Sequence, residues 1–177
     1  MFIVFTKQKN RAYNYKVTVE RSDRVRLQFH GVGKKFLVPH DIAHLIVESK
    51  LNMYRGFWGC VADGALFSGI TVIEGRQKSH AKLKSQQIIK QAHQQLRLAE
   101  CLVSAFNKIF TAKLDLVQAQ KHLAAISADI KPELSSSTIL DVCSTFEAFK
   151  TNWQVVDVGE SIELSWNQKS PNKSLRL

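Results

Sequence analysis

The chain has 177 residues, which is enough for a single domain with its own hydrophobic core. Apolar residues make up 45% of it, as in ordinary folded proteins, so the composition argues against a disordered chain. No apolar run approaches the roughly 20 residues that span a membrane, and we expect a protein that does not act in one.

The formal net charge is +10, and it is unevenly distributed along the chain. Residues 1–40 and 77–131 each hold nine Lys and Arg residues, against two and three acids respectively. Residues 132–168 hold one Lys and six acids. Two interpretations stay open: the basic segments form a surface for an acidic partner, or the opposed blocks face one another in the fold.

Three cysteines, about forty residues apart, include no C-x-x-C pair. They are Cys60, Cys101 and Cys143. An odd, widely spaced set favours reduced thiols that pack as small apolar residues over a disulfide framework or a zinc ribbon. We therefore expect a cytoplasmic protein.

The first third of the chain has the period of an antiparallel sheet. The expected strands are Phe2–Thr6, Tyr15–Glu20 and Val25–Phe29, with a turn at 21–24. Apolar residues alternate with polar and basic ones, which predicts one buried face and one solvated face.

A helix is expected from Pro39 to about Met53, because proline suits the first helical turn. Glycines and aromatic residues then crowd residues 54–75, which predicts a loop with at most one helical turn near 61–63.

Residues 76–152 are predicted to be helical. Between Gly75 and Pro132 there is neither glycine nor proline, and an apolar seam runs from Ile89 to Phe110 at spacings of three and four. A turn near Thr111 would let a second helix pack back on the first. A third helix would start after the serines at 135–137. The seam would pack within the chain, or it would form a homodimer.

A hairpin of residues 153–166 and a flexible basic tail of residues 167–177 complete the expected organisation. Residues 1–166 are thus predicted to form a single α+β domain, divided into a β-meander (1–38), a helix (39–53), a loop (54–75), a helical region (76–152) and the hairpin. A small antiparallel sheet would carry a long helical hairpin and further helices on one face.

His40 and His44 are the residues that point most clearly to chemistry. Four residues apart on a helix, they lie on one face, one turn from each other. Helices with an H-E-x-x-H motif present two zinc ligands at this spacing, with the glutamate as the base. In this chain Asp41 takes the glutamate's place, one methylene shorter, and is the candidate general base.

A catalytic zinc needs three protein ligands. Glu48 does not fit as the third, because on a straight helix it lies about 12 Å along the axis from His40. Ligand atoms lie only about 2.1 Å from the ion. The candidates for the third ligand are Asp63, Glu74 and His80. The competing interpretation is structural: Asp41 complements the helix dipole, and the histidines hydrogen-bond to the sheet.

A glycine-rich aromatic segment directly follows the histidine helix and suggests a ligand pocket, because aromatic rings in such a segment can stack on a ligand. The predicted pocket residues are Glu48, Arg55, Phe57, Trp58 and Asp63. The alternative is an aromatic plug that closes the end of the helix against the core.

Basic residues of the helical region are candidates for contacts with a polyanion. They are Lys78, Lys82, Lys84, Lys90 and Arg97. A charge-rich helix is more often simply a solvated face. The sequence has no helix-turn-helix, zinc-finger, KH or RRM pattern, and no P-loop, G-x-S-x-G or G-x-G-x-x-G motif.

The segment Val38-Pro39-His40-Asp41-Ile42-Ala43-His44, with Val47-Glu48 and Arg55-Gly56-Phe57-Trp58-Gly59 after it, resembles a group of uncharacterised bacterial proteins. That group carries V-P-H-D-L-x-H-x-x-V-E followed by R-G-F-W-G. The resemblance covers roughly residues 25–70, with Ile42 where leucine is usual. It implies a bacterial, cytoplasmic protein of the same fold and attaches no reaction to it.

Two hypotheses of function follow. In the first, the chain is a non-enzymatic binding protein whose basic surface meets an acidic partner, such as a nucleic acid. In the second, it is a metal-dependent hydrolase of zincin type, with zinc or another divalent metal bound at His40 and His44. The sequence favours the first, because the second lacks a third ligand and a glutamate base.

Overall fold

The structure is a computed structural model that describes residues 1–9, 14–31, 37–76, 79–126 and 134–167. The expected α+β class is confirmed, because the described residues form five strands in one antiparallel sheet and five helices. Lys78 and nearly all of the expected basic tail lie outside the described residues.

The sheet has the strand order β4-β3-β2-β1-β5. The strands are β1 (Phe2–Lys7), β2 (Tyr15–Glu20), β3 (Arg26–Gly31), β4 (Thr71–Glu74) and β5 (Ser161–Ser165). The predicted meander of the first three strands is confirmed, and alternate residues such as Ile3, Val17 and Leu27 are fully buried. One face of the sheet therefore contributes to the core, as the alternation predicted.

Both ends of the sheet differ from the prediction. β4 lies in the expected loop and pairs with β3. The expected C-terminal hairpin is wrong, because the last helix continues to Val155 and β5 pairs with β1 instead. Val155 and Val158, which lie in the expected first arm, are exposed. An arm there would have buried little apolar surface.

The helices are α1 (His40–Lys50), α2 (Phe57–Asp63), α3 (Ala81–Thr111), α4 (Leu116–Ala124) and α5 (Ser136–Val155). α1 ends about three residues before its predicted end, and α2 is a helix where mainly loop was expected. The turn after Thr111 is confirmed, and Ser135 caps α5 by accepting a hydrogen bond from the Thr138 N–H (3.2 Å).

The apolar seam of α3 packs within the chain: Ala99, Val103 and Phe106 are fully shielded from solvent, and the end residues Ile89 and Phe110 are partly buried. Whether the protein also forms a homodimer stays a prediction. No helix in the described part of the chain is both long and apolar enough to cross a bilayer.

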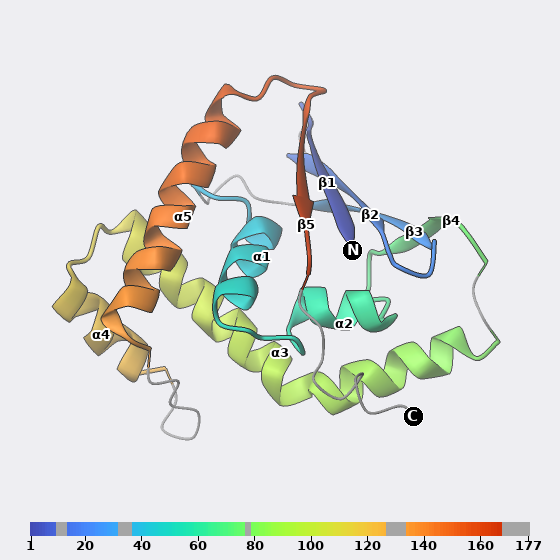
Figure 1. Ribbon diagram of the computed structural model, residues 1–177, viewed down its shortest axis with the longest axis horizontal. Helices are drawn as coiled ribbons and strands as arrows, with labels where there is room; N and C mark the ends of the chain where they lie inside the picture. The colour runs from blue at the N-terminus through green and yellow to red at the C-terminus, as the bar shows by residue number, and fades with distance from the viewer. Residues whose placement is uncertain (10–13, 32–36, 77–78, 127–133, 168–177) are drawn as a thin grey trace.

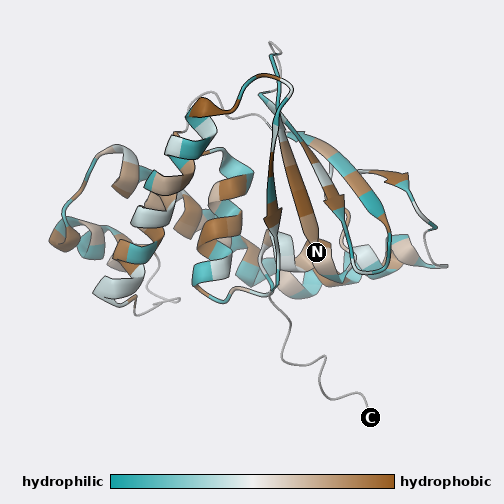
Figure 2. Ribbon diagram, turned by 45° about the horizontal axis from the view of Figure 1, so that its top comes forward, coloured by the Kyte–Doolittle hydropathy of each residue, from teal (hydrophilic) through white to brown (hydrophobic). Residues whose placement is uncertain are grey.

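Figures 1 and 2 show the helices gathered on one side of the sheet, with α3 running beneath α1 and α2. α1 lies between α3 and α5 and contacts both. This packing brings the start of α1 against the middle of α3, where the functional candidates meet.

Candidate metal centre

His40 and His44 project from the first turns of α1, where Pro39 is the N-cap residue. Their ring centroids are 4.7 Å apart, which confirms that they share one face of the helix. The His44 side chain is buried, whereas that of His40 is about one-third exposed. The pair therefore reaches from the core to the surface.

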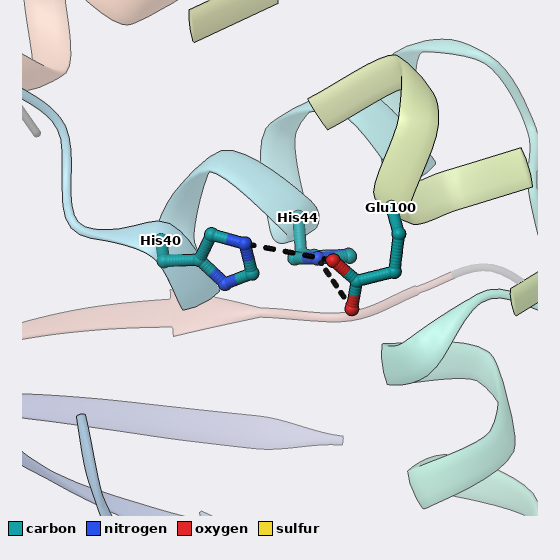
Figure 3. A group of neighbouring side chains, drawn as sticks. All are labelled: His40, His44 and Glu100. Carbon is teal, nitrogen blue, oxygen red and sulfur yellow. Dashed lines mark ion pairs between the residues drawn. The ribbon is translucent and has the colours of Figure 1, made fainter. Parts of the chain in front are cut away.

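Glu100 on α3 completes this group (Figure 3). His44 Nε2 lies 3.4 Å from Glu100 Oε1, and His40 Nε2 lies 3.6 Å from Glu100 Oε2. All three residues offer ligand atoms within 4.8 Å of one another. Two atoms that each lie about 2.1 Å from a tetrahedral ion are about 3.4 Å apart. The two nitrogen–oxygen distances are close to that length, although they end on different oxygens of Glu100.

Glu48 holds His44 from the opposite side. Its Oε1 lies 2.9 Å from His44 Nδ1, and its two oxygens accept hydrogen bonds from the backbone N–H groups of Phe57 (2.8 Å) and Trp58 (2.9 Å). Glu48 is fully buried at the N-terminus of α2. It therefore orients the imidazole, as carboxylates commonly do for metal-binding histidines. This agrees with the expectation that Glu48 is not itself a ligand.

Gly56 makes this contact sterically feasible. A Cβ at position 56 would lie 2.3 Å from Glu48 Cδ, inside van der Waals contact. The glycine of the Arg55-Gly56-Phe57 sequence thus leaves room for the carboxylate that holds His44.

Asp41, the candidate base, makes structural contacts. Its Oδ2 accepts a hydrogen bond from the Tyr15 hydroxyl (2.6 Å), and its backbone oxygen accepts one from Trp58 Nε1 (2.8 Å). Burial raises the pKa of the Asp41 carboxyl, although the Tyr15 hydroxyl and the two histidines oppose the rise. Asp41 thus ties α1 to β2 and α2.

The charges around His44 favour its protonated form when no metal is bound. Burial by itself lowers the pKa of His44, but the carboxylates of Glu100 and Glu48 outweigh it and raise the pKa to about 9. Burial and the nearby His44 lower the pKa of His40. His44 in turn lowers the pKa of Glu100. A proton and a metal cation would therefore compete for the same place between His44 and Glu100.

None of the three predicted third ligands belongs to this cluster. Glu74 accepts a hydrogen bond from Arg26 Nη1 (2.6 Å), His80 is the N-cap residue of α3, and Asp63 lines a separate cavity. Sequence reasoning missed Glu100. It is the only acid in α3 and directly follows a buried seam residue, and both features could have marked it.

The predicted ligand-pocket residues do not converge on one pocket. Glu48 and Trp58 are fully buried, and the Phe57 ring packs against His44 with centroids 6.1 Å apart. Trp58 lies against Phe5 of the sheet, as an aromatic plug would. Arg55 lines a cavity of about 480 Å³ together with glutamines of α3, away from Asp63.

The chain matches no protein-family model, no curated protein and no solved structure. The resemblance to the bacterial group therefore stays a prediction, and a proposal of function rests on the geometry of the site.

The predicted polyanion contacts that the structure describes are all exposed on α3: Lys82, Lys84, Lys90 and Arg97. Spacings of seven and eight residues place Lys82, Lys90 and Arg97 on one side of the helix. Lys84 points elsewhere and lines the cavity that also contains Asp63.

Proposed function

We propose that this protein binds one divalent transition-metal ion through His40, His44 and Glu100 and uses it as a Lewis acid. The observation that carries the proposal is His44 Nε2. This atom is buried and makes no hydrogen bond within the described residues, yet it lies 3.4 Å from Glu100. Buried polar atoms normally have a close partner. The Glu100 carboxylate is a distant one at 3.4 Å, and a metal ion between the two groups would bind both.

The donor set supports a catalytic type of site. Two histidines and one carboxylate are the ligands of several catalytic zinc centres and of non-haem iron(II) centres. Such a set leaves coordination positions open, where a metal-bound water is activated. Because His40 and Glu100 are partly exposed, a substrate can approach from solvent. Zinc-dependent hydrolysis is therefore the first activity to test. Asp41 would have a structural role in it, because its carboxylate is bound to Tyr15.

Metal binding by tag-free protein, stripped with a chelator, tests the proposal. We expect about one zinc per chain by calorimetry, and loss of this binding in His44→Gln and Glu100→Gln. The control variant His93→Gln removes an exposed histidine from α3, the helix that carries Glu100, and should bind zinc normally. Cobalt(II) in place of zinc should give visible absorption bands in the parent protein and the His93→Gln control alone.

Two results would contradict the proposal. One is a folded parent protein that shows no saturable binding of zinc, cobalt or iron(II). The other is equal binding by the parent and by folded His44→Gln, because the ion would then lie elsewhere. Iron(II) binding in preference to zinc would keep the site and change the chemistry to that of the iron enzymes.

A further inference from the structure

A cavity of about 480 Å³ lies between the turn that joins α1 to α2 and one face of α3. The turn contributes residues 51–55, and Figure 1 shows it passing beside the middle of α3. The α3 residues of the wall lie at spacings of three and four on one face of the helix, with Gln94 beside them: Gln91, Gln95, Leu98 and Leu102. Ligand pockets in proteins commonly have this volume.

The turn that forms one wall of the cavity has a fixed backbone. The Met53 N–H donates to the Glu48 backbone oxygen (2.8 Å). Asn52 has φ 54°, a left-handed conformation that asparagine adopts more readily than most residues. α2 packs so closely on the turn that a Cβ on Gly59 would lie 1.9 Å from the Tyr54 backbone oxygen. A ligand would therefore meet a wall that needs little ordering, which lowers the cost of binding.

The cavity wall carries one uncompensated positive charge. Arg55 supplies a guanidinium group, and the described residues that line the cavity include no Asp or Glu. The Arg55 side chain makes no hydrogen bond or ion pair with a described residue. An anionic group would therefore meet a cation here without competition from a carboxylate of the wall.

The α3 side of the cavity opening consists of neutral amides. Gln91, Gln94 and Gln95 are exposed and line the cavity, whereas the nearby Lys90 and Arg97 lie outside it. The three glutamine side chains also make no hydrogen bond with a described residue. An amide side chain both donates and accepts hydrogen bonds, so this set matches a ligand that itself carries an amide.

The floor of the cavity is apolar. Met53 and Leu102 are buried there, and Leu51 and Leu98 are partly buried. Apolar atoms of a ligand would lose contact with water against these side chains, which favours binding. The cavity thus combines an apolar floor with neutral amides and a single cation.

We propose that this cavity binds a small carboxylic acid that carries an amide group and an apolar side chain, which is the chemistry of an N-acylated amino acid. The carboxylate pairs with Arg55, and the apolar side chain packs on Leu98 and Leu102. The glutamines bind the amide. The site is separate from the proposed metal centre, because none of the three proposed metal ligands lines the cavity.

Calorimetric titration of the full chain with N-acetyl-leucine tests the proposal, in a chelator that keeps metals away from the carboxylate. We expect saturable binding to the parent protein, weakened roughly tenfold or more in Arg55→Gln. Arg97→Gln removes the same charge from an exposed position outside the cavity and should change the affinity by less than about twofold. Thermal unfolding would confirm that both variants fold.

Two related compounds test the two ends of the ligand. N-acetyl-leucinamide lacks the carboxylate and N-acetylglycine lacks the apolar side chain, so each should bind the parent protein roughly tenfold more weakly than N-acetyl-leucine. In Arg55→Gln, N-acetyl-leucine and N-acetyl-leucinamide should bind alike, because the group that distinguishes them is gone.

A charge placed in the wall tests the position of the ligand. Gln95→Glu should weaken the binding of N-acetyl-leucine roughly threefold or more, because it sets a carboxylate beside that of the ligand. Gln86→Glu adds the same charge to an exposed position of α3 outside the cavity and should change the affinity by less than about twofold.

Three results would overturn the proposal. The first is no saturable binding of N-acetyl-leucine to the parent protein at millimolar concentrations. The second is equal weakening in Arg55→Gln and Arg97→Gln, because diffuse charge would then explain the binding. The third is equal binding of N-acetyl-leucine and N-acetyl-leucinamide by the parent protein, because Arg55 would then not recognise a carboxylate.

Discussion

His44 is the residue at which three helices meet. Its Nδ1 faces Glu48, which is bound to the first N–H groups of α2, and its Nε2 faces Glu100 of α3. A buried imidazole with a carboxylate on each side has two stable states: a doubly protonated ring, or a neutral ring with a cation at Nε2. The first state is a structural ion pair, and the second is the metal-bound form of the proposed function.

Tyr15 offers a test of the hydrogen bond that joins β2 to Asp41, next to His40. Burial and the negative charge of Asp41 raise the pKa of the Tyr15 hydroxyl far above its usual value. The folded protein therefore keeps the Tyr15 proton at a pH where the unfolded chain loses it. Its contribution to stability is complete below about pH 10 and falls as the pH rises further, by about 1.4 kcal/mol per unit.

We expect Tyr15→Phe to be less stable than the parent protein near neutral pH, by about 1–3 kcal/mol, because the hydrogen bond to Asp41 is lost. Above about pH 10 this difference should shrink, since phenylalanine cannot ionise. Urea unfolding at several pH values measures it, with Tyr54→Phe as the control. A difference that stays constant up to about pH 11 would show that the Tyr15 ionisation is not coupled to folding.

The junction of α1 and α2 is the element on which the site depends. Gly56 has φ −72°, which any residue adopts, so its special role comes from space alone. Gly59 has a similar role, because a Cβ there would lie 1.9 Å from the backbone oxygen of Tyr54. The two glycines let α2 approach the end of α1 closely enough to bind Glu48.

Gly56→Ala should therefore destabilise the protein by about 1–3 kcal/mol, as an added methyl group does in a packed interior. The displaced Glu48 carboxylate should also weaken zinc binding about 10- to 100-fold, if zinc binds as proposed. Arg55→Ala, at the exposed neighbouring position, is the control for both measurements. Chemical unfolding of Gly56→Ala that matched the parent protein would mean that α2 shifts freely to make room.

The elements differ in how far the sequence could predict them. Alternation over Tyr15–Glu20 is a local pattern, and the strand followed it. β4 has only four residues, mostly exposed, and becomes a strand because the edge of β3 is available to it. The spacing of four residues predicted that His40 and His44 share one face of a helix. Glu100 lies next to them only because α1 packs on α3. No local pattern encodes that long-range contact.

At the scale of the whole molecule, the basic side chains lie in different environments. Arg26 pairs with Glu74, Lys50 pairs with Asp141, and Lys84 lines a cavity of about 140 Å³. The Lys50–Asp141 pair joins α1 to α5. Lys50 lies outside the two basic segments 1–40 and 77–131, so the interpretation that those segments face the acidic one stays a prediction. Lys82, Lys90 and Arg97 remain as a basic stripe on the outer side of α3.

Variants of the basic stripe test the hypothesis of a polyanionic partner. Each phosphate contact that releases a counterion adds about 0.9 to the slope of log affinity against log salt concentration. If the stripe follows a phosphate backbone, Lys82→Gln/Lys90→Gln/Arg97→Gln should lower the slope for a duplex DNA oligonucleotide by about 2–3. Lys9→Gln/Lys113→Gln/Lys121→Gln removes the same net charge from other exposed positions and should lower it by less than about 1. Equal effects of the two triple variants would mean that DNA responds to the net charge of +10 and not to this stripe.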